Sequence, residues 1–173
     1  MDKQGLIKNL TENHLEFIAC LDQISTDEFT VSKNEKWTAG QQLEHIYLSV
    51  KPVGLGFRLP KFLLKLVWGK SNREGKSYDE LIERYQAKLA NGSKASGAFV
   101  PNKVDLKKGQ KLKENLKNEV LNLCLSIEKI SEEDLDCYLL PHPILGKLTL
   151  REMLYFTIYH VKHHENQLMK SGV

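Results

Sequence analysis

Apolar side chains recur at intervals of three and four residues along four long stretches of the chain. The stretches cover residues 3–24, 38–52, 112–130 and 149–168. In the first stretch the repeated positions are Ile7, Leu10, His14, Ile18 and Leu21. This spacing places them on one face of an α-helix, so the pattern predicts four amphipathic helices.

Local signals mark where several helices begin and end. A Ser or Thr followed three residues later by Gln or Glu forms a capping box, which is typical of a helix start. The boxes are Thr38 with Gln41, Ser77 with Glu80, and Thr149 with Glu152. We expect a short helical turn after Ser25 and an end or bend of the second helix at Pro52. The helix that follows Ser77 should end near residues 91–92, and residues 141–146 should form a loop with no long strand.

These elements predict an all-α fold, a four-helix bundle with a long helical crossover between helices two and three. The crossover holds the apolar segment 55–68 and the short helix that follows Ser77. A chain of 173 residues is long enough for a substantial core. We therefore expect residues 1–173 to form a single domain.

The composition of the chain argues against nucleic-acid binding, membrane spanning and secretion. Lys and Arg number 25 against 22 Asp and Glu, a net charge of +3, so we expect no nucleic-acid partner. No apolar run reaches the roughly 20 residues of a membrane span, and residues 1–5 do not resemble a signal peptide. Three cysteines without a CxxC pair indicate a reducing, cytoplasmic setting and no Cys-based zinc site.

Residues 55–68 are apolar with interspersed cations and are interrupted by Pro60. Such a composition is compatible with an anionic membrane surface. Packing against the bundle or against a partner copy of the chain is the favoured interpretation. Stable membrane association is therefore not expected.

Two histidines near the C-terminus carry the main chemical signal. His160 and His164 are four residues apart, so on a helix they point the same way, and apolar neighbours place that face inward. Two inward imidazoles form half of a transition-metal site. His45, about two turns into a capped helix, is the best third ligand. Without the His160 and His164 pair, His45 would be interpreted as a histidine at the edge of the core that hydrogen-bonds a neighbouring residue.

The remaining candidates have alternative interpretations. His163 points about 100° away from His164 and is a packing residue or a neighbour of the ligands. His14 could be a fourth ligand, a hydrogen-bond acceptor for one, or a core histidine, which is the favoured interpretation. Gln167 could hydrogen-bond a ligand imidazole or a bound water, and His142 most simply shapes a turn between two prolines.

Three neutral imidazoles suit zinc, with nickel as the alternative. Such an ion lowers the pKa of a bound water or thiol. Two enzymatic hypotheses follow, attack of a thiolate on a small electrophile and hydrolysis of an ester or amide. A non-catalytic metal-binding protein is a third, and the absence of HExxH gives no support to zincin-type proteolysis.

Three segments, 37–45 (WTAGQQLEH), 141–149 (PHPILGKLT) and 159–167 (YHVKHHENQ), resemble the DinB-like superfamily, which includes the YfiT-type proteins. The resemblance implies an up-down-down-up bundle, often a homodimer, with a divalent ion on His45, His160 and His164. Characterised members include S-transferases and isomerases that use bacillithiol, mycothiol or glutathione on small molecules. Others are described as metal-dependent hydrolases with no proven substrate. Residues 54–107 lie outside the matching segments, and we expect them to shape the substrate entrance.

Overall fold

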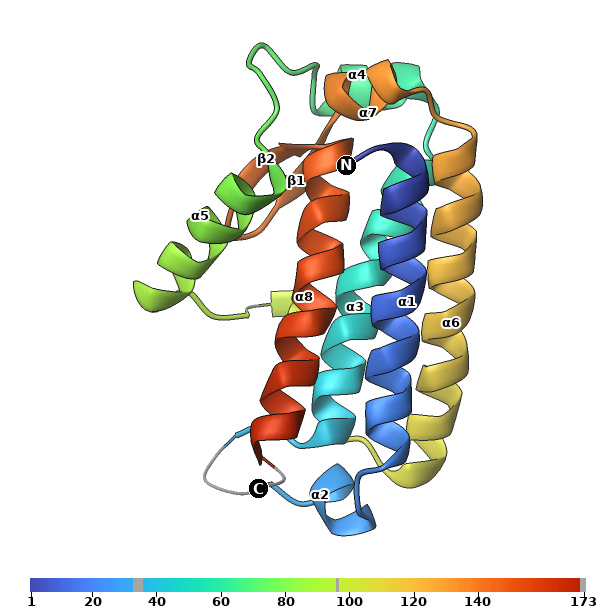
Figure 1. Ribbon diagram of the computed structural model, residues 1–173, viewed down its shortest axis with the longest axis vertical. Helices are drawn as coiled ribbons and strands as arrows, with labels where there is room; N and C mark the ends of the chain where they lie inside the picture. Colours follow the sequence, from blue (N-terminus) through green and yellow to red (C-terminus); the bar gives the residue numbers. More distant parts are fainter. Residues whose placement is uncertain (33–35, 96, 172–173) are drawn as a thin grey trace.

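The computed structural model describes residues 1–32, 36–95 and 97–171. Its main body is a bundle of four long helices (Figure 1), which are α1 (Lys3–Asp22), α3 (Ala39–Arg58), α6 (Leu106–Glu128) and α8 (Leu150–Ser171). α1 packs against α6 and α8, and α3 packs against the same two helices. α1 and α8 run in one direction and α3 and α6 in the other, so the predicted up-down-down-up four-helix bundle is confirmed.

The core lies where the apolar faces of the four helices meet. Its fully buried side chains include Leu6, Leu10 and Phe17 from α1, Leu43 from α3, Leu116, Leu123 and Ile127 from α6, and Leu154 and Val161 from α8. Burial of each large side chain contributes about 1.5–3 kcal/mol. The predicted amphipathic stripes therefore supply most of the driving force that holds the helices together.

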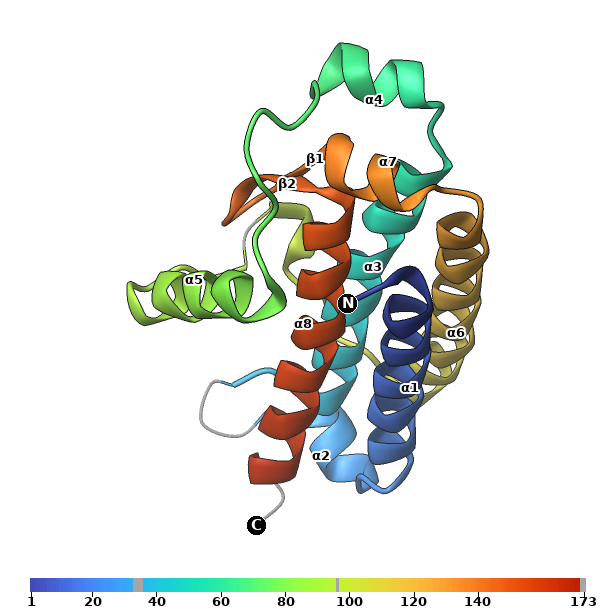
Figure 2. The same ribbon diagram turned by 45° about the horizontal axis from the view of Figure 1, so that its top comes forward.

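The crossover contains α4 (Lys61–Val67), α5 (Tyr78–Ala90) and a 3₁₀ turn, η1 (Gly97–Phe99). Figure 2 shows α4 at one end of the bundle, with α5 extending sideways near α8. The buried Glu152 carboxylate attaches this segment to α8. It accepts two hydrogen bonds from the Arg73 guanidinium at 2.6 and 2.7 Å and one from the Lys76 backbone N–H at 2.8 Å.

The capping boxes form where the sequence predicts them. Thr38 and Ser77 cap α3 and α5 through reciprocal hydrogen bonds with Gln41 and Glu80. Glu152 accepts from the Thr149 backbone N–H, and the Thr149 hydroxyl accepts from the Glu152 N–H. The turn expected after Ser25 is α2 (Thr26–Thr30).

Two expected helix boundaries, an end at Pro52 and a start near residue 112, were wrong. α3 continues through Pro52 to Arg58, because Pro52 is exposed and water can satisfy the carbonyl left without its N–H partner. α6 begins at Leu106 rather than near residue 112, because the Asp105 side chain caps it by accepting from the Lys108 N–H at 2.7 Å.

The expected loop at residues 141–146 is confirmed only for residues 143–145, because the residues on either side of them form strands. Strands β1 (Leu139–His142) and β2 (Gly146–Thr149) pair as an antiparallel hairpin after the short helix α7 (Glu132–Cys137). Leu140 lies opposite Leu148, and both side chains are buried. Gly146 begins β2 at a φ of +78°, a conformation that favours glycine. Four cross-strand pairs, of which only Leu140 with Leu148 joins two buried aliphatic side chains, are too short a pattern to reveal strands in advance.

Candidate metal centre

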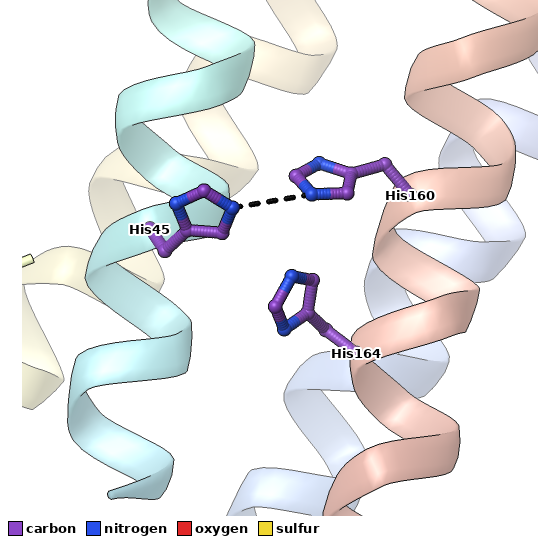
Figure 3. Close-up of side chains that lie close together, drawn as sticks. All are labelled: His45, His160 and His164. Atoms are coloured by element: carbon purple, nitrogen blue, oxygen red, sulfur yellow. Dashed lines mark hydrogen bonds between the residues drawn. The ribbon is translucent and has the colours of Figure 1, made fainter. Parts of the chain in front are cut away.

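Three histidines from two helices meet inside the bundle. Figure 3 shows His45 of α3 facing His160 and His164 of α8. One ring nitrogen from each residue lies within 4.8 Å of the other two, and the Nε2 atoms of His45 and His160 are 3.2 Å apart. All three side chains are buried. The structure therefore brings together the three residues that the sequence singled out, and the cluster could hold a metal ion.

Hydrogen bonds to the outer nitrogens orient two of these rings. His45 Nδ1 lies 2.7 Å from the carbonyl oxygen of Phe99, and His164 Nδ1 lies 3.1 Å from Gln42 Oε1. Both oxygens only accept hydrogen bonds, so each Nδ1 carries the proton. The Nε2 lone pairs of both residues are consequently available inside the cluster, as in protein metal sites.

The environment keeps the cluster neutral. Burial lowers the pKa of His160 and His164 well below the usual range, and repulsion from neighbouring histidines adds to the effect. Burial also lowers the pKa of His45. Two nitrogens that bind one zinc ion tetrahedrally at 2.0–2.1 Å lie about 3.3–3.4 Å apart. The observed 3.2 Å between His45 and His160 fits such a donor set.

A cavity of about 310 Å³ reaches the cluster, with His45 and His160 in its wall. Most of the wall is apolar and includes Val53, Met153 and Phe156, and none of the described lining residues is acidic. Catalytic zinc sites combine three protein ligands with an open position, and three histidines beside a cavity are compatible with that arrangement.

The crossover forms a large part of this cavity. It contributes Leu59, Trp68, Tyr85, Leu89, Lys94, Ala95 and Phe99 to the lining. Phe99 also supplies the carbonyl that orients His45. The segment expected to shape the entrance therefore builds the wall and supports one candidate ligand.

Three other predicted residues lie outside the cluster. The Nε2 atoms of His163 and Gln167 are 2.8 Å apart, and the His163 ring stacks near Tyr159. Gln42, which the sequence analysis missed, is the amide that contacts His164. His14 Nδ1 hydrogen-bonds the Leu10 carbonyl at 2.7 Å, which agrees with a core role.

His142 is the second residue that sequence reasoning underestimated. Its Nδ1 accepts hydrogen bonds from the backbone N–H groups of Ile144 at 3.1 Å and Leu145 at 3.0 Å, so it shapes the turn as expected. An Nδ1 that accepts leaves the proton on Nε2. The ring also lines the cavity and lies edge-on to Phe156, with ring centroids 4.2 Å apart. His142 thus presents a neutral N–H group next to the cluster.

Solved structures of the same fold are similar to this chain over nearly its whole length. TT2238, a four-helix bundle protein, has a TM-score of 0.61 at 16% identity, covering 98% of this chain and 99% of its own. An uncharacterized protein from Clostridium difficile 630 has a TM-score of 0.60 at 15% identity, covering 99% and 96%. No curated protein sequence matches.

A third neighbour corrects one expectation. The colibactin self-resistance protein ClbS, solved in complex with a dsDNA, has a TM-score of 0.54 at 19% identity and covers 97% of this chain and 94% of its own. The exclusion of nucleic acid from the net charge was therefore wrong, because a protein of this fold binds it. Net charge says nothing about local charge, and residues 51–73 contain six Lys and Arg and no acidic residue.

The sequence profile of the DinB superfamily matches residues 6–168, which is nearly the whole chain. The match agrees with the four-helix bundle and includes all three clustered histidines. The chain belongs to the DinB superfamily.

Proposed function

We propose that the protein is a divalent-metal-dependent enzyme, a thiol-dependent S-transferase that acts on small apolar electrophiles. One observation carries the proposal: three neutral, buried imidazoles lie together, and two of them, His45 and His160, are in the wall of an apolar cavity. His45, His160 and His164 would hold the ion, with zinc as the expected metal and nickel as the alternative. When bound, the ion would favour the thiolate form of a small thiol, which is the nucleophile.

The lining of the cavity favours thiol transfer over hydrolysis. A hydrolase that uses a carboxylate as general base would need an acidic side chain beside the ion, and none of the described lining residues is acidic, whereas attack by a metal-bound thiolate needs no such base. Neither nearby glutamate is directed to the cavity. Glu44 accepts from the Asn102 backbone N–H at 2.6 Å and pairs with Lys108, and Glu165 pairs with Lys162.

In the proposed reaction, the thiol sulfur forms a bond to the electrophilic carbon as the bond from that carbon to its leaving group breaks. The thiol proton would be released to solvent when the thiolate forms, and the leaving group would depart with the electron pair of the broken bond. The apolar walls would hold the body of the electrophile, and the Nε2–H of His142 would donate to an acceptor atom on it. Bacillithiol, mycothiol and glutathione are the thiols to test.

The first test is the metal content of tag-free protein measured by mass spectrometry. We expect about one zinc ion per chain in the wild type and none in His160→Ala, because two ligands do not hold the ion tightly. His163→Ala is the matched control and should retain the metal. If no metal is present in the wild type after reconstitution with zinc, the proposal fails.

The second test is conjugation of monochlorobimane to each thiol by the zinc-loaded protein. Turnover that is lost in His160→Ala and kept in His163→Ala supports the transferase. Hydrolysis of ester substrates without thiol turnover would support a hydrolase instead. Zinc binding without either activity would support a non-catalytic metal-binding protein.

A further inference from the structure

Five large apolar side chains are exposed around the bend that joins α3 to α4. Leu55, in the last turn of α3, is 51% exposed, and Leu59, which directly follows α3, is 36% exposed. On α4, Phe62, Leu66 and Val67 are 68%, 78% and 59% exposed. We call these five residues the α4 patch. Only Leu64 of α4 is buried, so packing against the bundle accounts for one face of this helix and not for the patch.

The patch lies within the most cationic segment of the chain. Residues 51–73 contain six Lys and Arg and no Asp or Glu. Arg58, Lys61 and Arg73 pair with Glu119, Asp134 and Glu152 from other helices, which leaves half of these cations without an acidic partner in the described part of the chain. Lys65 lies between Phe62 and Leu66 and has no ion-pair partner among the described residues. An exposed apolar helix with cations beside it is typical of segments that lie on anionic membrane surfaces.

The patch also adjoins the mouth of the cavity. Leu55 and Leu59 are both exposed and part of the cavity lining, and Trp68, which follows α4, lines it as well. Figure 2 shows α4 set off from the bundle at one end of the molecule. A flat surface laid against the patch would therefore lie next to the entrance of the apolar cavity.

We propose that the α4 patch docks the protein reversibly on an anionic lipid surface. Phe62, Leu66 and Val67 enter the boundary between headgroups and acyl chains, and Lys65 lies among the lipid phosphates. Docking requires no metal and stands apart from the proposed chemistry. It places the cavity mouth beside a phase in which apolar molecules concentrate.

The charge distribution favours lipid over two other occupants. A second copy on a twofold axis would place the patch against itself, so that the cationic segments face each other and repel. A nucleic acid would pair with the cations but leave the large aliphatic side chains without an apolar partner. An anionic bilayer offers an apolar interior to the exposed aliphatic and aromatic side chains and phosphate groups to the cations.

The test is co-sedimentation of the purified protein with two kinds of vesicle. One contains phosphatidylcholine alone, and the other equal parts of phosphatidylcholine and phosphatidylglycerol. The test variant is Phe62→Ser with Leu66→Ser. The matched control is Leu121→Ser with Leu125→Ser, another pair four residues apart on a helix, 58% and 47% exposed on α6. Zinc content measured on each variant separates failure of docking from failure of the metal site.

We expect the wild type and the α6 control to sediment with the anionic vesicles and not with the neutral ones. The α4 variant should bind at least about tenfold more weakly with its zinc content unchanged, since two large apolar side chains no longer enter the bilayer. Absence of wild-type sedimentation, or equal binding by the α4 variant, overturns the proposal. If the protein does not bind vesicles but forms a dimer, and the α4 variant disrupts that dimer, the patch is assigned to contact with a second copy. If the protein instead binds a DNA duplex and Lys65→Glu abolishes that binding, the segment is assigned to nucleic acid.

Discussion

Replacement of Gln42 by Leu should weaken metal binding although Gln42 is not a ligand. Its Oε1 lies 3.1 Å from His164 Nδ1, and both side chains are buried. The Leu variant keeps most of the volume but removes the acceptor that holds the His164 proton on Nδ1. The proton can then move to Nε2, where it competes with the metal.

Loss of such an outer hydrogen-bond partner typically lowers metal affinity by about 10–100-fold, or about 1.4–2.7 kcal/mol. We expect Gln42→Leu to fall in this range rather than to abolish binding, because His45 and His160 keep their positions. Competition with a chromophoric zinc chelator measures the affinity. Emission from Trp37 offers a second readout, because its ring lies 4.9 Å from that of His45 and 6.5 Å from that of His164.

Gln167→Ala is the matched control. The sequence pattern placed Gln167 beside His164, but its amide contacts His163, so the variant should bind zinc like the wild type. Circular dichroism checks that both variants keep the helical bundle. The reasoning is refuted if Gln42→Leu binds zinc as tightly as the wild type, or if Gln167→Ala weakens binding to the same extent.

Three further predictions concern buried polar residues. Burial lowers the pKa of His14 to about 4 in the folded protein. As the pH falls, the unfolded chain therefore takes up a proton on His14 at a higher pH than the folded protein does. The free energy of unfolding should decrease as the pH drops from about 6.5 towards 4. Urea unfolding should show that His14→Leu removes about 2 kcal/mol of the loss between pH 7 and pH 5; an unchanged pH dependence would contradict this. His142→Asn keeps an acceptor for the turn but removes the Nε2–H from the cavity. Its kcat/KM with a thiol and monochlorobimane should fall about tenfold at unchanged zinc content, and full activity would argue against the proposed donor role. Glu152→Ala removes the acceptor of the Lys76 and Thr149 backbone N–H groups and the partner of the partly exposed Arg73 guanidinium. It should lower the free energy of unfolding by about 2–3 kcal/mol, measured by urea denaturation; a change near zero would show that the crossover is held by other contacts.

The helical part of the fold was predictable because its signals are local. The apolar repeat and the capping boxes at Thr38, Ser77 and Thr149 depend only on residues within one or two turns, and the structure contains each of these helices. The predictions of helix ends and strands failed where exposure to solvent or packing against a distant segment outweighs the preference of the local sequence. α3 passes Pro52 because that side of the helix is exposed, and the hairpin near Leu140 forms because its strands pack on the bundle.

Part of the candidate site also follows from local sequence, and part depends on how the helices pack. The spacing of His160 and His164 places them on one helix face without any tertiary information. His45 is a different case, because its position beside them requires α3 to pack against α8 in one register. The sequence motifs single out His45 as the third member, and the packing of the two helices brings the three rings together.

The sequence by itself determined the number and faces of the long helices and the direction in which the paired histidines point. These properties follow from the 3.6-residue period of the helix, which any short segment expresses. Only the tertiary structure decided which groups orient the imidazoles and which residues line the cavity. Phe99 and Gln42 lie 54 and 122 positions from the histidines that they contact, so only the packing of the bundle and its crossover brings them into hydrogen-bonding distance.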